Sequence, residues 1–187
     1  MDPRSTSSRL AALMLSLALG AMAIAGCGGD EEPPTPTGAP SDFVLSFEHI
    51  EGTVPPPFHF EWRVEFDADG AGSATYAPDY PGKGVPRYQA TFEVDQSERD
   101  DLYETLSSRG TLIDLQAAEN PPVGGPRDTA TITARDEIYR VPAYDSGGDP
   151  PLRYLTPRIQ DLVPARDWER FEREAKRYAE REYGESP

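Results

Sequence analysis

Alternation of apolar and polar residues predicts that the middle of the chain forms a sheet. Every second residue of 58–66 is large and apolar: Phe58, Phe60, Trp62, Val64 and Phe66. The positions between them hold His59 and charged residues. A period of two predicts an antiparallel strand with one face in the core and the other in water. The same pattern predicts strands over 43–50, 73–77 and 88–94.

After residue 94 the apolar period becomes helical. Asp95 and Glu98 have the spacing of a capping box, which predicts a helix start, and Gly110 is placed to end that helix. Its apolar stripe would consist of Leu102, Tyr103 and Leu106.

The remaining sequence predicts short strands and then helices. Residues 112–115 suggest a strand, and 129–134 with 138–141 suggest a hairpin around Arg135-Asp136. A short helix is expected over 152–162. Pro164 then opens a last helix that runs to about residue 183.

This order of elements predicts the fold class. Strands, a helix, more strands and then helices favour α+β over alternating βαβ units. We expect one domain over residues 43–187, with an antiparallel sheet of about six or seven strands, helices packed on one face and a long C-terminal helix.

The first 26 residues predict an export signal. Arg4 and Arg9 precede an uncharged apolar run over residues 10–25, which is too short to span a bilayer comfortably and is followed by small residues. A positive end, an apolar middle and small residues are typical of a signal peptide, here residues 1–26.

The residues at the end of this segment resemble the bacterial lipobox. Ile24-Ala25-Gly26-Cys27 has the aliphatic residue, the two small residues and the cysteine of that motif. The resemblance implies that the Cys27 thiol receives a diacylglycerol and becomes the mature N-terminus, so that acyl chains anchor the protein to a membrane. Gly28 follows the cysteine, where Asp would be expected in an inner-membrane lipoprotein. The resemblance therefore implies the outer membrane where there are two membranes, and otherwise the outer face of the cell membrane.

Between the cysteine and the first strand lies a predicted disordered linker. Residues 28–42 are rich in Gly, Pro and acidic residues and lack apolar periodicity. With Cys27 they form the predicted segment 27–42, which would reach at most about 45 Å at roughly 3.1 Å per residue.

The net charge and the cysteine count exclude some classes of partner and one kind of cross-link. The chain has 187 residues and a net charge of −15. An acidic protein repels phosphate backbones and anionic lipid headgroups, so we expect no nucleic-acid binding and no electrostatic membrane adhesion. Cys27 is the single cysteine, which excludes an internal disulfide.

Candidate chemistry is sparse, and we expect no catalytic set, no cofactor and no metal site. His49 and His59 are the only histidines and lack zinc-site spacing. His59 falls on the polar strand face, where solvent exposure is expected, and His49 shares a face with Phe47 and is expected to be partly buried. Asp67-Ala68-Asp69-Gly70 predicts a hairpin turn rather than a calcium loop. A catalytic pair of carboxylates of the glycosidase type is a further possibility in so acidic a chain, but the sequence does not single out two residues for it.

Residues 58–144 resemble small bacterial envelope domains of unknown function. The resemblance rests on three motifs: Asp67-Ala68-Asp69-Gly70, Asp128-Thr129-Ala130-Thr131-Ile132 and Tyr139-Arg140-Val141. The emfourin-like metalloprotease inhibitors have a similar element order. The likeness implies a fold more than an activity, and it assigns no inhibitory residue to this chain.

Three functions therefore stay open for the exported domain. The first is a non-enzymatic module that binds an envelope protein or component. The second is an inhibitor of secreted proteases, which would need an exposed loop such as 78–86 or 121–126. The third is a carboxylate-based hydrolase, for which convergent acids in a pocket would be evidence.

Overall fold

The computed structural model describes residues 38–184. The predicted signal peptide 1–26, Cys27 and most of the predicted linker 27–42 lie outside the described residues. The last five linker residues are included, and they contact the domain. The backbone N–H of Ala39 donates to Asp100 at 2.8 Å, and Asp42 accepts from the backbone of Arg135 and Asp136.

The described chain has an α+β fold, as the sequence predicts. Its open sheet has the strand order β4-β3-β2-β1-β5-β6, with every neighbouring pair antiparallel. The strands are β1 (Val44–Ile50), β2 (Glu61–Phe66), β3 (Ala71–Ala77), β4 (Tyr88–Glu93), β5 (Arg127–Ala134) and β6 (Glu137–Val141). The predicted hairpin is confirmed, since Arg135 and Asp136 both have positive φ, at 56° and 62°.

The predicted strand over 112–115 is not a strand. This segment is a loop after the first helix, and the nearest ladder contact is the isolated bridge between Ala117 and Asp145. Leu112 and Leu115 pack against the core as half-buried residues, whereas Ile113 is 53% exposed. Leu112 and Leu115 therefore contribute to the core from a loop, without belonging to a strand.

Three helices complete the described fold. They are α1 (Gln96–Ser108), α2 (Thr156–Leu162) and α3 (Ala165–Tyr183). The capping box of α1 is confirmed, with Asp95 and Glu98 each accepting the other's backbone N–H at 2.9 Å. Helix α2 is shorter than predicted because turns replace its first residues and Pro157, which has no N–H to donate, stands in its first turn.

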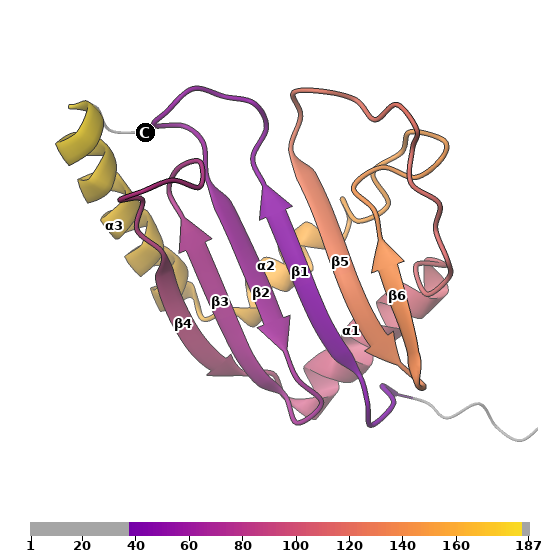
Figure 1. Ribbon diagram of the computed structural model, residues 1–187. Helices are drawn as coiled ribbons and strands as arrows, with labels where there is room; N and C mark the ends of the chain where they lie inside the picture. The colour runs from indigo at the N-terminus through magenta and orange to yellow at the C-terminus, as the bar shows by residue number, and fades with distance from the viewer. Residues whose placement is uncertain (1–37, 185–187) are drawn as a thin grey trace, which may run out of the picture. The chain divides into compact units, whose positions relative to one another are not determined.

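The core lies where helices pack against the sheet. Figure 1 shows α1 and α2 behind the strands and α3 beside β4. Phe43 contacts Tyr103 of α1, with ring centroids 5.4 Å apart. Trp62 of β2 meets Trp168 of α3 edge to face at 5.6 Å. The strand positions between the core residues hold polar side chains such as Arg63, which pairs with Glu48 at 2.8 Å.

The two ends of the sheet differ. The described chain starts at the end that carries the β2–β3 and β5–β6 turns (Figure 1). The opposite end, here called the loop end, carries the loops 51–60, 78–87 and 120–126. Two of these loops touch, since the N–H of Thr53 donates to the carbonyl of Gly124 at 3.3 Å. These three loops therefore lie at the end of the sheet opposite the one where the described chain begins.

Candidate functional site

Both histidines of the chain lie at the loop end, and each contacts carboxylates. His49 is near the end of β1, and His59 stands two residues before β2. Around them lie Glu51, Glu61 and Asp128. The chain has only these two histidines, so their common location is the first indication of a site.

His49 is held between aromatic rings and acids. Its ring is near-parallel to those of Phe60 and Trp62, with centroids 5.8 and 5.1 Å away. Its Nδ1 lies 2.6 Å from Asp128 Oδ1, and its Nε2 lies 3.9 Å from a carboxylate oxygen of Glu51. The hydroxyl of Thr156 donates to the other oxygen of Asp128 at 2.8 Å. The side chain of His49 is 12% exposed, which confirms the predicted partial burial.

The prediction for His59 is wrong. The strand begins at Glu61 instead of residue 58, because residues 55–58 form a turn in which the N–H of Phe58 donates to the carbonyl of Pro55. The turn exchanges the two environments, leaving Phe58 52% exposed and His59 1% exposed. Alternation of buried and exposed residues applies only within a strand, and this strand begins two residues after His59.

Buried His59 fastens neighbouring segments together. Its Nδ1 lies 3.3 Å from the carbonyl oxygen of Gly52, and its Nε2 lies 3.3 Å from Oε1 of Glu61. Its ring stacks on Tyr80 with centroids 3.6 Å apart and planes 7° from parallel. The Tyr80 hydroxyl donates to the carbonyl of Val54 at 2.9 Å. The β1–β2 and β3–β4 loops are therefore tied through one imidazole.

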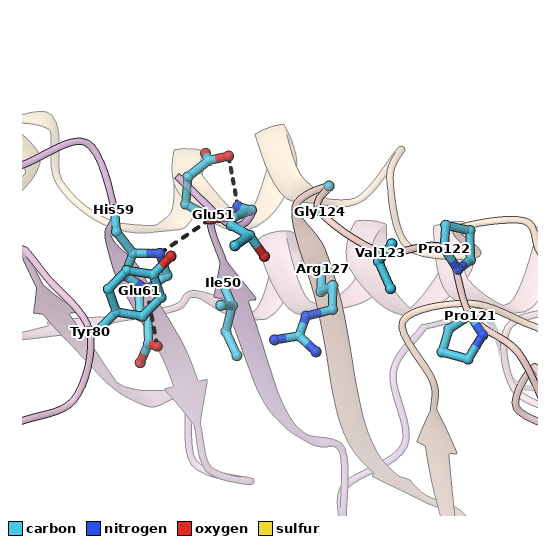
Figure 2. A pocket seen from close by; sticks show the side chains of 13 residues that line it. Ile50, Glu51, His59, Glu61, Tyr80, Pro121, Pro122, Val123, Gly124 and Arg127 are labelled. Carbon is cyan, nitrogen blue, oxygen red and sulfur yellow. Dashed lines mark hydrogen bonds and ion pairs between the residues drawn. The ribbon is translucent and has the colours of Figure 1, made fainter. Parts of the chain in front are cut away.

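A pocket of about 260 Å³ opens beside this stack. Figure 2 shows His59, Tyr80 and Glu61 on one side, and the segment 121–125 on the other. Ile50 and Arg127, from neighbouring strands, lie between them. Within residues 38–184 the Arg127 guanidinium forms no ion pair. The pocket thus presents one cationic group among acidic neighbours in a strongly acidic protein.

Two apolar side chains are exposed at the loop end. Phe58 is 52% exposed, and Val123, at the tip of the segment 121–125, is 96% exposed. The chain that follows Val123 is anchored, since the carbonyl of Gly124 accepts from the N–H of Thr53 and that of Pro126 accepts from the Tyr144 hydroxyl at 3.3 Å. Contiguous apolar patches mark contact surfaces, whereas single exposed apolar side chains are common on proteins.

The described contacts of both histidines are with carboxylates, a carbonyl oxygen and aromatic rings. A nucleophilic triad needs a hydroxyl or thiol at the free imidazole nitrogen. The Nε2 of His49 lies 3.9 Å from a carboxylate oxygen of Glu51, and the Thr156 hydroxyl donates to Asp128. His59 has both ring nitrogens engaged and is buried. Among the described residues no three His, Cys, Asp or Glu side chains are grouped to hold a metal ion.

Sequence reasoning missed several site residues. Asp128 is explained by turn preference when only the sequence is considered, yet its partners are His49 and Thr156, distant in the chain. Tyr80 and Arg127 carry no motif. The predicted turn role of Asp67 is confirmed, since its side chain accepts from the N–H groups of Asp69 and Ala71.

Comparison with known proteins adds no assignment: no protein-family model matches the chain, and no curated protein matches it significantly. Within residues 38–184, none of the helices combines the length and the apolar character that crossing a bilayer requires.

Proposed function

We propose that this protein is a non-enzymatic binding module, anchored by lipid on Cys27 to the exported side of a bacterial envelope. The membrane is the outer one where there are two, and otherwise the outer face of the cell membrane. The module binds an envelope protein or component through its loop end. Its acidic surface disfavours nucleic acid, so its partner is not a nucleic acid.

The observation that supports this proposal most is where the described chain begins relative to the loop end. The described chain begins at the end of the sheet opposite the loop end (Figure 1). A lipid attached upstream of residue 38 would therefore join the domain at the end opposite Phe58, Val123 and the pocket. The polar sheet face carries side chains such as Arg63 and Glu48, and we expect a partner at this face or at the loop end.

The lipid is tested by mass spectrometry of the protein from its native membrane. We expect the N-terminal peptide to begin at Cys27 and to carry the added mass of a diacylglycerol. The Cys27→Ala protein should lose membrane association and keep the same folded domain. An intact Met1, or a Cys27 without lipid, would remove the anchor from the proposal.

The loop end is tested by site-specific photocrosslinking in intact cells. A photoreactive residue in place of Val123 should give a discrete crosslinked product. The same residue in place of Asp69, in the turn at the opposite end of the sheet, is the matched control. Equal crosslinking at both positions, or none at Val123, would contradict a partner at the loop end.

One feature favours a second function, inhibition of secreted proteases. Val123 stands almost fully exposed between prolines on a braced loop, as an inhibitory segment would. If this function applies, Val123→Asp should abolish inhibition of a secreted protease, and Lys83→Ala in the other proline loop should not. The hydrolase comes third, because Glu51, Glu61 and Asp128 are each engaged with a histidine.

A further inference from the structure

A second, larger pocket lies on the side of the sheet that carries the helices. It measures about 540 Å³ and is bounded by the sheet and by the segment that joins α2 to α3. Its volume lies within the range of small-molecule sites. The side chains that matter are the aromatic Phe60, Trp62, Tyr76 and Trp168 and the acidic Asp161 and Glu172.

The aromatic walls hold one another in place. Phe60 and Tyr76 are nearly parallel, 11° apart, with centroids 5.9 Å apart, and Trp62 meets Trp168 edge to face. The indole N–H of Trp168 donates to the carbonyl of Gln160 at 2.9 Å. A site whose walls are fixed beforehand loses little entropy when a ligand enters.

The two acids of this pocket are exposed to solvent and form no ion pair with another described residue. Elsewhere on α3 most acids pair with arginines, as Asp167 does with Arg170 at 3.0 Å and Glu174 with Arg177 at 3.0 Å. Glu172 forms no ion pair or hydrogen bond within the described residues, and neither does Asp161. No lysine or arginine is among the described residues that line the pocket.

The field of Glu172 reaches the aromatic wall. The pKa of Tyr76 is raised to about 12, first by burial of its phenol and then by the negative charge of Glu172. Tyr76 and Glu172 line the same pocket, so one ligand can contact both.

We propose that this pocket binds an organic cation, with its apolar or ring-shaped body against the aromatic walls and its ammonium or guanidinium group at Asp161 and Glu172. Aromatic rings attract cations through their quadrupole, and the two carboxylates provide the negative charge that pairs with a bound cation. The same carboxylates repel anions. This site is separate from the loop-end pocket and does not depend on the lipid anchor.

The pocket carries its own reporter, because Trp62 and Trp168 are the two tryptophans of the chain. We would titrate the full chain with phenethylammonium, 2-phenylethanol and phenylacetate, which share a ring and differ in charge. Phenethylammonium should change tryptophan fluorescence saturably, with an affinity about tenfold above that of the alcohol. Phenylacetate should give no saturable change.

Substitutions then test the acids. The double variant with Asp161→Asn and Glu172→Gln should lose about tenfold in affinity for phenethylammonium and keep its affinity for the alcohol. Glu169→Gln is the matched control, because Glu169 lies on the same helix and pairs with Arg173 outside the pocket. Unchanged circular dichroism of each variant shows that the fold is intact.

Three results would overturn the inference. Equal affinity for the cation and the alcohol would mean that the pocket does not select charge. Unchanged cation affinity in the double variant would mean that Asp161 and Glu172 are not the counterions. Absence of a saturable change with any probe would mean that the pocket binds none of this class.

Discussion

Strand alternation predicts a buried Phe58 and an exposed His59, but in the structure Phe58 is exposed and His59 is buried. We therefore expect His59 to contribute more to stability than Phe58. His59→Ala removes a buried ring, its stack on Tyr80 and its contacts with Gly52 and Glu61. We expect a loss of about 2–4 kcal/mol in the free energy of unfolding, measured by urea denaturation. Phe58→Ala should change it by less than about 0.5 kcal/mol. The reverse order of effects would contradict the burial of His59.

Asp42 makes the stability of the fold depend on pH in the acidic range. The N–H groups of Asp136 and Arg135 donate to its carboxylate and lower the pKa of Asp42 below its ordinary 3.8. Since the folded-state pKa is the lower one, the stabilisation is complete above the unfolded value and is lost as pH falls through the folded value.

The expected result is a steeper acid dependence in the natural protein than in Asp42→Asn. Melting temperatures measured from about pH 5 to about pH 2 should converge as Asp42 becomes protonated. Asp69→Asn, in the neighbouring turn, is the control, because the Asp69 side chain accepts no hydrogen bond from another described residue. Parallel curves for natural protein and Asp42→Asn would show that this carboxylate contributes nothing.

Two loops approach so closely at the loop end that one position must be glycine. A Cβ at Gly52 would overlap the carbonyl oxygen of Gly124. Gly52→Ala should therefore separate the loops and cost about 1–3 kcal/mol in unfolding free energy. At Gly82 the nearest atom would be 3.6 Å away and φ is not positive, so Gly82→Ala should be neutral or slightly stabilising. Equal effects would mean that the loop contact is not needed.

Local signals predicted the elements better than they predicted the site. The capping box of α1, the positive-φ hairpin at Arg135-Asp136 and the turn at Asp67 depend on residues near in sequence, so the sequence revealed them. The contact of His49 with Asp128 and the stack of His59 on Tyr80 join different strands and loops. Such pairs follow from strand register, which the sequence did not specify.

Charge acts on the molecule as a whole. A net charge of −15 makes the folded chain repel itself, and the exposed ion pairs return little of that energy. Raising sodium chloride from about 0.01 M to about 0.15 M shortens the screening length from about 30 to about 8 Å. We expect the melting temperature to rise, as followed by circular dichroism. A fall would show that the ion pairs outweigh the repulsion.

The place of β1 in the sheet has a consequence for synthesis. One of its neighbours, β2, follows almost at once in sequence, but the other, β5, is encoded far downstream, where Ile132 faces Leu45. Until β5 has left the ribosome, one edge of β1, which is one of the two central strands, has no hydrogen-bonding neighbour. A product terminated between α1 and β5 should therefore adhere to other nascent chains rather than persist as a smaller stable protein.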